Sequence, residues 1–361
     1  MQESQRLQSP TSAGSEGIGA LPATMRAVVL RAFGAPEVLH IEEVPLPQPA
    51  SGEVLIHVHA VSVNRTLDLA VRAGQYVHRP KLPHVLGVDP CGVVAAVGPE
   101  VTTRKVGDRL ACGAIVGTQP SGLPIILGVN TWGGYAEYVK VPVHVTHFIP
   151  AALDFMTAAV VARHAPLAFT QLRDRAKVKP GEWVLIMGAA GGLGSIALQA
   201  AKHLGAQVIA AAGTDARVDA ARQLAADAGV NYRGQDLTAE VRRITGGAGV
   251  DVVLENIGDP ELFPKAFAAL APGGRLVTAG GHAGGIVPLD IKHLYLNRIT
   301  IIGNPHDTPE NFELGLKLAA EGKLKVLIDQ VLPLSEAVHA HRLVEARGGT
   351  GKILLDPTQT A

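Results

Sequence analysis

Residues 184–205 read VLIMGAAGGLGSIALQAAKHLG and join an apolar strand, a glycine-rich turn and an amphipathic helix. Ala189, Gly191 and Gly194 have the A-x-G-x-x-G spacing directly between strand and helix. A backbone without Cβ atoms lets a pyrophosphate approach closely, and the start of the helix offers free N–H groups and a positive dipole end. We therefore predict a nucleotide-binding turn formed by Ala189, Ala190, Gly191, Gly192, Leu193 and Gly194. A tight turn without a ligand is the alternative.

The chain around this turn, from residue 151 to residue 303, alternates apolar strands with segments of helical periodicity. This alternation predicts an α/β fold with a doubly wound parallel sheet covered by helices on both faces. Residues 25–150 instead contain short β-rich runs separated by turns, which indicates a small barrel or rolled sheet. Residues 304–357 supply only two helices and two strands, so we expect them to pack back onto the first domain. Residues 358–361 form a short tail.

The composition of the chain argues against several classes of function and location. Lys plus Arg and Asp plus Glu both number 32, so no general field attracts nucleic acid or an anionic membrane. The uncharged run 183–201 contains four glycines and fits a strand, turn and helix better than a membrane span. Residues 1–24 have the polar composition of a disordered extension and lack the features of a secretory signal. Two cysteines, Cys91 and Cys112, cannot build a disulfide framework, which favours the cytoplasm.

The end of the second strand of this α/β region indicates which nicotinamide cofactor is bound. An NAD site usually carries Asp or Glu there to accept the ribose hydroxyls, whereas this chain has Gly213. Arg217 follows four residues later and could pair with a 2′-phosphate. The missing carboxylate therefore favours NADP, although Arg217 could equally be a solvated helix residue.

Several longer stretches resemble the medium-chain dehydrogenase/reductase family, in the zinc-independent branch that includes NADPH quinone oxidoreductases and related enone and enoyl-thioester reductases. The resemblance covers residues 25–357 and is carried, besides the glycine turn, by MRAVVLRAFGAPEVL (25–39), VSVNRTLDLAVRAGQY (61–76), LPHVLGVDPCGVVAAVG (82–98), VGDRL (106–110), GGYAEYVKVP (133–142), APGGRLVTAGG (271–281) and GKILLD (351–356). It implies a GroES-like barrel domain split around a Rossmann domain, with the active site in the cleft between them.

The resemblance also assigns cofactor contacts. It implies that Gly213, Arg217 and Tyr232 hold the 2′-phosphate of NADPH. It places the nicotinamide near the Asn256–Gly258 loop, Gly280, Gly281 and Asn304, where mainly backbone groups hold the ring.

Zinc-dependent members of the family carry a Cys and a Gly-His-Glu motif that this chain lacks. Asn64 stands at the Cys position and 87–89 read Gly-Val-Asp. The four-cysteine structural lobe is also missing, and Cys112 alone remains there. Neither an amide nor a valine replaces a thiolate or an imidazole as a zinc ligand. The histidine pairs offer no third ligand at a recognisable spacing, so we predict that no zinc is bound; these pairs are His57 and His59, His144 and His147, and His339 and His341.

Two departures from the family pattern affect the substrate side. One extra residue lies between Asn64 and Asp68, and Leu167 stands where many relatives have threonine. Asp68 itself is expected to be a turn or cap residue rather than an acid.

The predicted reaction is transfer of hydride from NADPH to a quinone or to an activated carbon–carbon double bond. Tyr76 is the candidate proton donor and Asn64 its companion hydrogen-bond donor. Tyr76 could instead be a boundary tyrosine packed on the barrel, and Asn64 a turn residue.

Alternative functions and the assembly also follow from sequence. An enoyl-CoA or acryloyl-CoA type reductase would need a basic groove, for which Arg72, Arg79 and Lys81 are available. An NADPH-binding sensor or structural protein with little turnover is the other alternative. The apolar strand Ile299–Gly303 ends the sheet, and in relatives it pairs with its copy across a two-fold axis, so we expect a homodimer. A loop that covers this edge is the alternative.

Overall fold

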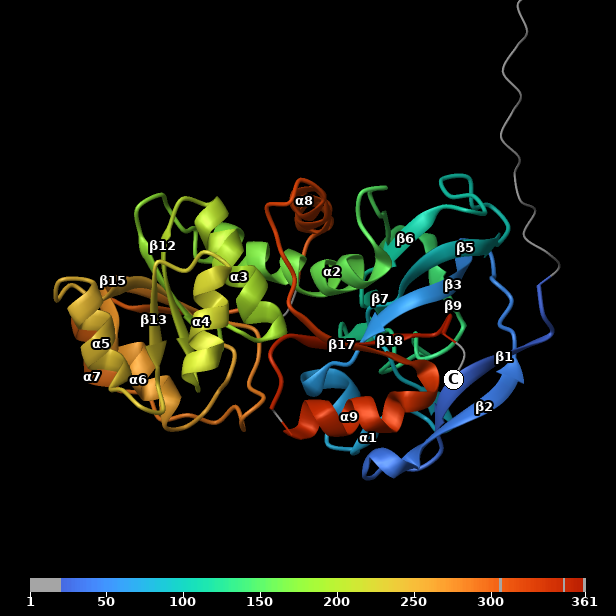
Figure 1. Ribbon diagram of the computed structural model, residues 1–361, viewed down its shortest axis with the longest axis horizontal. Helices are drawn as coiled ribbons and strands as arrows, with labels where there is room; N and C mark the ends of the chain where they lie inside the picture. The colour runs from blue at the N-terminus through green and yellow to red at the C-terminus, as the bar shows by residue number, and fades with distance from the viewer. Residues whose placement is uncertain (1–20, 305–306, 347, 360–361) are drawn as a thin grey trace, which may run out of the picture.

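The computed structural model describes residues 21–304, 307–346 and 348–359, which form two lobes side by side (Figure 1). The predicted disordered extension lies mostly outside the described residues. Its last residues are ordered, because the Ala23 carbonyl accepts a hydrogen bond of 3.0 Å from the Leu46 N–H and strand β1 begins at Thr24.

One lobe contains the predicted parallel sheet. Its strands follow the order β13-β12-β11-β14-β15-β16, which is the doubly wound arrangement. They are β11 (Trp183–Met187), β12 (Gln207–Ala212), β13 (Ala228–Asn231), β14 (Val250–Leu254), β15 (Leu270–Thr278) and β16 (Thr300–Gly303). Strand β13 was not predicted as a separate strand from the sequence, because AGVN is short and has no alternating pattern.

Helices cover both faces of this sheet, as predicted. Side chains of β11 alternate between two apolar clusters: Val184 and Ile186 belong to one, and Leu185 and Met187 to the other. The first cluster includes residues of α3 (Gly192–His203), α4 (Asp215–Gln223) and α8 (Pro309–Ala320). The second includes residues of α5 (Leu237–Ile244) and α6 (Leu262–Ala268), with α7 (Ile291–Leu296) beside it. The uncharged run 183–201 is therefore β11, the turn and most of α3. Within the described residues, no helix is long and apolar enough to cross a membrane.

The other lobe is the predicted rolled β-structure. A three-stranded sheet has the order β2-β1-β4, and a larger sheet has the order β10-β6-β5-β3-β18-β17, with β9 also paired to β3. The strands are β1 (Thr24–Leu30), β2 (Leu39–Pro45), β3 (Glu53–Ser62), β4 (His84–Val85), β5 (Cys91–Val97), β6 (Arg109–Cys112), β9 (Tyr138–Pro142), β10 (Thr146–Phe148), β17 (Ile328–Pro333) and β18 (Lys352–Asp356), beside a hairpin of β7 (Ile115–Thr118) and β8 (Pro124–Ile126).

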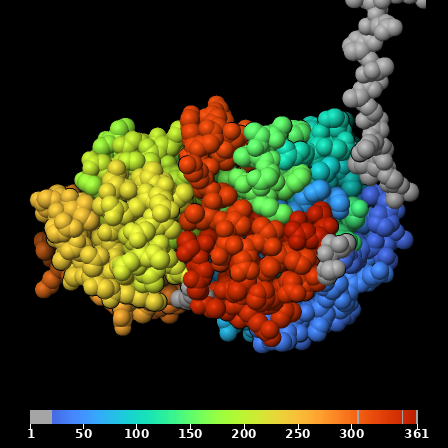
Figure 2. Space-filling view, viewed as in Figure 1, coloured from blue at the N-terminus to red at the C-terminus, as the bar shows by residue number. Residues whose placement is uncertain are grey.

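Part of the C-terminal segment, strands β17 and β18 and helix α9 (Ala337–Ala346), belongs to this lobe, whereas α8 packs against α2 (Phe155–Phe169). Strand β18 pairs antiparallel with β3, with Leu354 opposite Ser62. Helix α9, after the short turn Leu334–Glu336, packs beside them. In Figure 2 the C-terminal residues lie across the middle of the molecule, between the two lobes.

Helix α2 (Phe155–Phe169) joins the lobes (Figure 1). Asp154 caps it by accepting a hydrogen bond of 2.7 Å from the Thr157 N–H. Small side chains let neighbours approach closely: a Cβ added at Gly315 of α8 would lie 2.5 Å from the Ala165 Cβ. Buried residues of α2, the parallel sheet and strands β3 and β5 form one continuous apolar cluster, so α2 holds the lobes together.

The segment where an extra residue was expected, directly after Asn64, forms a turn of π-helix. Residues Arg65–Leu69 make this turn, and the Leu69 N–H donates to the Asn64 carbonyl five residues earlier at 3.3 Å. A second π-helical turn, Thr170–Arg175, follows α2 after Pro166. A π-turn absorbs one inserted residue without shifting the flanking chain, so α1 (Ala70–Arg72) continues directly.

Candidate active site

The glycine turn connects β11 to α3, as its spacing predicts. Gly188 has a φ of +67°, and a Cβ at Gly194 would lie 2.2 Å from the Gly188 carbonyl oxygen. Residue 194 must therefore be glycine for the turn to close. Gly191 precedes the helix as its N-cap and is exposed, so the first N–H groups of α3 face outward from the turn. These features fit a diphosphate group.

Gly192 has a different reason to be glycine. A Cβ there would lie 2.4 Å from His164 Nε2 and 2.9 Å from Lys352 Cδ. Because Lys352 belongs to strand β18 of the barrel lobe, the turn touches the other lobe at this point. The missing Cβ at position 192 thus permits contact between the lobes, a role that the glycine spacing by itself does not predict.

The residues assigned to the nicotinamide end come together at the carboxyl edge of the parallel sheet. Asn256 follows β14, Gly280 and Gly281 follow β15, and Asn304 follows β16. The Asn256 Oδ1 accepts a hydrogen bond of 2.7 Å from the Ala279 N–H, while its Nδ2 is buried without a partner. The Asn304 N–H donates to the Thr278 carbonyl at 2.8 Å. A buried, unsatisfied amide donor at this edge fits a carboxamide acceptor on a ligand.

Glu255 shapes this loop and was not predicted. Its side chain is almost fully buried and accepts hydrogen bonds from the N–H groups of Ile257 and Gly258. Burial raises the pKa of Glu255, although these bonds lower it.

Two of the residues assigned to the 2′-phosphate, Gly213 and Tyr232, lie side by side, and Arg233 lies next to them. A Cβ at Gly213 would lie 3.2 Å from the Tyr232 hydroxyl and 3.3 Å from Arg233 Nε. The Arg217 Nη2 donates a hydrogen bond of 2.8 Å to the Gly349 carbonyl. Arg233 was missed from sequence because an exposed arginine after a strand has no distinguishing spacing.

Asn64 lies in a buried polar network rather than facing outward. Its Nδ2 donates to Asp89 Oδ2 at 3.0 Å and also contacts the Ser62 carbonyl and hydroxyl at 3.2 Å. Its Oδ1 accepts a hydrogen bond of 2.9 Å from Lys352 Nζ. Because both N–H groups are engaged inside the protein, the prediction that Asn64 donates to a substrate is corrected: Asn64 positions Lys352.

Lys352 is the functional candidate that sequence reasoning missed. Its ammonium donates to the Val63 carbonyl and to Asn64 Oδ1, both at 2.9 Å, which leaves a third N–H. Burial lowers the pKa of Lys352 to about 8, against the opposing effect of Asp89 and Asp68. A lysine that begins the apolar strand KILLD was its only sequence signal.

Asp68 has the turn and capping role expected from sequence. It accepts hydrogen bonds from the Asn64 N–H at 2.7 Å and from the Gly87 N–H at 3.1 Å. Burial, together with the nearby Asp89 carboxylate, raises the pKa of Asp68 to about 7.

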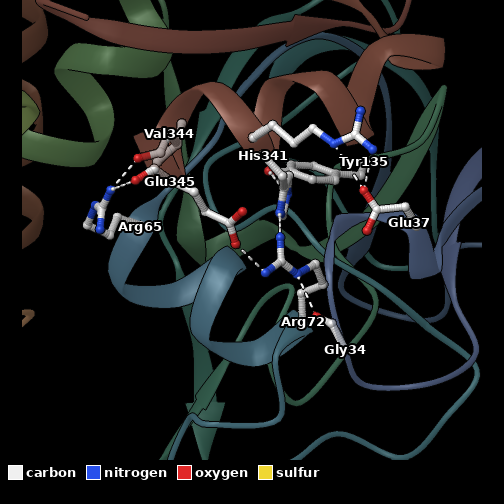
Figure 3. A network of polar contacts seen from close by, with 9 residues as sticks. Gly34, Glu37, Arg65, Arg72, Tyr135, His341, Val344 and Glu345 are labelled. Atoms are coloured by element: carbon white, nitrogen blue, oxygen red, sulfur yellow. Dashed lines mark hydrogen bonds and ion pairs between the residues drawn. The ribbon is translucent and has the colours of Figure 1, made fainter. Parts of the chain in front are cut away.

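A chain of polar groups runs from Tyr135 through His341 and Arg72 to Glu345 on α9 (Figure 3). Burial and the nearby Asp68 carboxylate raise the pKa of Tyr135, and His341 Nε2 lies 3.3 Å from the Tyr135 hydroxyl. Arg72 Nη1 lies 3.3 Å from His341 Nδ1, and Arg72 Nη2 pairs with Glu345 Oε1 at 2.5 Å. Burial lowers the pKa of His341 to about 3, so the ring is neutral and accepts from Arg72.

The basic residues considered for a coenzyme A groove are not equivalent. Arg72 is 3% exposed and also donates to the Gly34 carbonyl at 3.0 Å, so it cannot serve a phosphate at the surface. Arg79 is exposed, with its guanidinium 5.8 Å from the Phe33 ring. Lys81 is exposed as well. The structure therefore corrects the inclusion of Arg72 in that groove.

Tyr76 is half-buried, and its ring packs partly against the barrel core. Its hydroxyl has no hydrogen-bond partner in the described part of the chain, and no bond links it to the Asn64 network. Burial raises the pKa of Tyr76, while the positive charge of Arg163 on α2 opposes this rise. The hydroxyl is therefore protonated and available as a donor, and it lies within the electrostatic range of α2.

The donor groups at the positions of the family's zinc ligands are not suited to a metal ion. The Asn64 amide oxygen already accepts from an ammonium group, and Val88 offers no donor. Within the described residues, no three His, Cys, Asp or Glu side chains gather in a way that could hold a metal. The His57 and His59 rings lie 5.0 Å apart, and they stack on Tyr138 and Phe155 instead. These residues do not fit a catalytic zinc ion, because zinc needs three or four donating ligands.

Comparisons with known proteins agree with this architecture. The family described as alcohol dehydrogenase GroES-like domain matches residues 50–151, and the family described as zinc-binding dehydrogenase matches residues 192–321. The second match excludes the barrel positions discussed above, so its description does not bear on their ligands.

Individual relatives match almost the whole chain. A quinone oxidoreductase from Homo sapiens is 32% identical over 92% of this chain and 97% of its own length. The crystal structure of AibC is 34% identical, covers 97% of this chain and 100% of its own, and has a TM-score of 0.87. A structure titled NAD-dependent alcohol dehydrogenase is 37% identical, covers 92% of this chain and 99% of its own, and has a TM-score of 0.85.

Fold and site define an oxidoreductase built from a Rossmann sheet and a GroES-like barrel. The chain belongs to the medium-chain dehydrogenase/reductase family, in its quinone oxidoreductase-like branch, as its sequence resemblance predicts. Relatives of this kind use nicotinamide cofactors and act on small molecules.

Proposed function

We propose that the protein is an NADPH-dependent, zinc-independent reductase of a quinone or an activated carbon–carbon double bond. The observation that carries the proposal is the ammonium of Lys352 held against the Asn64 amide oxygen. A buried cation there would repel a second cation. A zinc ion could therefore not bind beside it and polarise the substrate oxygen. A conjugated acceptor suits such a site, since it needs a proton donor rather than a Lewis acid.

Each part of the site would have its own role in this reaction. The turn 188–194 would hold the diphosphate, and bound nicotinamide would supply the hydride. The Tyr76 hydroxyl would hold a proton ready for the acceptor oxygen, as negative charge develops there. Lys352 would fix the positive charge near this region, with Asn64 and Asp89 keeping it in place.

NADPH is preferred to NADH in this proposal because of the residues around Gly213. No carboxylate occupies position 213, Tyr232 and Arg233 lie beside it, and Arg217 follows four residues later on α4. A 2′-phosphate would receive charge-assisted hydrogen bonds there, whereas the ribose hydroxyls of NADH would gain none of them.

The test is a set of acceptors assayed with NADPH. We expect steady NADPH consumption with quinones or enones, no loss of activity with a chelator, and no zinc in the purified protein by metal analysis. Enoyl thioesters belong in the same set, since Arg79 and Lys81 remain available to them. Oxidation of simple alcohols with NADP⁺, without reduction of any conjugated acceptor, would overturn the proposal. Tight NADPH binding without turnover would instead indicate a sensor.

We also propose that 25–150 and 304–357 form the catalytic lobe, that 151–303 form the cofactor lobe, and that the protein is cytoplasmic. The two cysteines, Cys91 and Cys112, are both buried and free, which suits a reducing compartment.

A homodimer is the proposed assembly. Strand β16 is at the edge of the sheet, and Ile301 on it is exposed. Nearby apolar side chains are also exposed, namely Ile286, Ile291, Tyr295 and Leu296. Pairing of β16 with its copy would satisfy the open strand edge and cover this apolar surface. Light scattering should give twice the chain mass at micromolar concentration, and Ile301→Lys should lower it; a monomeric parent protein would contradict this assembly.

A further inference from the structure

Arg163 is unusual among the charged residues of the protein. It is the only charged residue of α2, whose sequence is FMTAAVVARHAPLAF. Its Nε is buried without a hydrogen-bond partner. No hydrogen bond or ion pair joins Arg163 to any residue in the described part of the chain, and no carboxylate lies within ion-pair distance. A half-buried guanidinium without a partner costs stability, so a ligand is the natural source of the missing acceptor.

The burial pattern shows where Arg163 faces. Between Ala158 and Leu172, every residue is buried except Arg163 and Leu167. These two are four residues apart and so lie on one side of the helix, one turn from each other. Between residues 158 and 172, only this side of the helix is partly exposed. It carries a guanidinium next to an apolar side chain.

The groups near Arg163 belong to the proposed active site. Its neighbour in sequence, His164, contacts the glycine turn at Gly192, where Lys352 also approaches. The charge of Arg163 acts on Tyr76, His164 and Lys352. Lys352 is balanced by the Asp89 and Asp68 carboxylates and held by Asn64. Arg163 has no neighbouring carboxylate of this kind. Its positive charge at the lobe junction is therefore not compensated by another residue in the described part of the chain.

We propose that Arg163 binds an anionic group of the substrate, a carboxylate, while Leu167 packs against its apolar part. This inference rests on the proposed function and names the class of acceptor: an acidic enone or quinone. A planar guanidinium binds a carboxylate through two parallel hydrogen bonds, which fixes orientation as well as position. Tyr76 then remains free for the acceptor oxygen.

Two other oxyanions could meet Arg163: the diphosphate of the cofactor, and the enolate oxygen formed during reduction. The diphosphate would make Arg163 a cofactor residue. The enolate would make it important for neutral and acidic acceptors alike. If Arg163 binds a carboxylate of the substrate, only acidic acceptors should depend on it. The dependence on the acceptor therefore distinguishes the three possible ligands of Arg163.

The experiment compares two acceptors, 4-(4-carboxyphenyl)-3-buten-2-one and its methyl ester, with the full-length protein and NADPH. We expect the parent protein to favour the acid. Arg163→Gln should lower kcat/KM for the acid about ten- to a hundredfold, mainly through KM, with the ester changed less than about twofold. Arg163→Lys should retain part of the preference. Arg175→Gln is the matched control, because Arg175 is an exposed arginine beyond the same helix.

Binding measurements keep the proposal testable if turnover is absent. Calorimetry of the protein–NADP⁺ complex should show that the saturated acid, 4-(4-carboxyphenyl)butan-2-one, binds more tightly than its ester, and that Arg163→Gln removes this difference. That result without turnover would refute the proposed reaction but support the carboxylate site. Equal losses for acid and ester, a weaker NADPH affinity in Arg163→Gln, or no change at all would each overturn the inference.

Discussion

The two sides of the lobe junction differ in how the chain builds them. The glycine turn takes its residues from one short stretch, 188–194, between a strand and a helix. The polar cluster that meets it takes residues from four separate segments: Asn64 and Asp68 near β3, Asp89 before β5, Arg163 and His164 on α2, and Lys352 on β18. The turn acts through backbone groups, whereas the cluster acts through buried charges. Local sequence can therefore specify the turn, but the cluster depends on how distant segments pack.

The difference predicts that backbone changes on the turn side have the largest effects. Gly194→Ala would place a Cβ 2.2 Å from the Gly188 carbonyl oxygen. We expect a loss of about 3 kcal/mol in the free energy of unfolding, measured with urea, and at least about a hundredfold weaker NADPH binding by fluorescence titration. Gly117→Ala is the control, since its Cβ would make an ordinary contact of 3.4 Å with Ile125. Unchanged NADPH binding in Gly194→Ala would contradict the assignment of the turn.

On the cluster side, the hydroxyl of Tyr76 should matter for chemistry rather than for binding. Tyr76→Phe removes one donor and leaves the ring packed on the barrel. If that donor acts only as the acceptor oxygen gains charge, kcat and kcat/KM should fall together, by about ten- to a thousandfold. Steady-state kinetics measures this, with Tyr138→Phe, which changes a tyrosine stacked on His57, as the control. An unchanged kcat would indicate that solvent or a backbone N–H, rather than Tyr76, is the donor.

The buried charges should also show in the pH dependence of stability. The pKa of Asp68 is about 7 when folded and near its usual value of 3.8 when unfolded. Between these values the folded state holds the extra proton, so this group makes the protein less stable as the pH rises from about 4 to 7. Lys352, whose pKa is about 8, interacts with Asp68, so we expect a loss of about 2 kcal/mol between pH 5 and pH 8 rather than the full shift.

Urea unfolding of Asp68→Asn at pH 5 and pH 8 checks this. The variant should show a smaller loss of stability over that interval than the parent protein. The comparison of the two slopes cancels the contributions of groups that do not interact with Asp68. A variant with the same slope as the parent would show that Asp68 does not titrate in this range.

The smallest effects are expected at the exposed end of the cofactor site. Arg217→Ala and Arg233→Ala should each reduce the preference for NADPH over NADH by about tenfold, because each removes one charge-assisted contact in solvent-exposed surroundings. Fluorescence titration with both cofactors measures the preference, and NADH affinity should not change. Arg175→Ala is the control. If Arg217→Ala alone abolished the preference, Arg233 would have no part in it.

Part of the site was recognisable from sequence because its residues have fixed spacing. The order strand, glycine turn, helix identified residues 189–194, and the glycine at the end of the next strand identified Gly213. Arg233 was not found, although it lies next to Tyr232, because nothing local distinguishes it from any exposed arginine. Asn64 was found, but its orientation was wrong, because an amide offers a donor and an acceptor and only packing decides which of them is free.

The sequence by itself determined the α/β fold, the nucleotide turn and the family, because strand and helix periodicity and glycine spacing act over short lengths of chain. Only the tertiary structure decided the chemistry opposite the turn. Lys352 is 288 residues from Asn64, and the two meet because β18 pairs with β3. Arg163 is left without a partner by the packing of α2 between the lobes. Burial and the balance of charge depend on every segment that surrounds a group, so no local pattern encodes them.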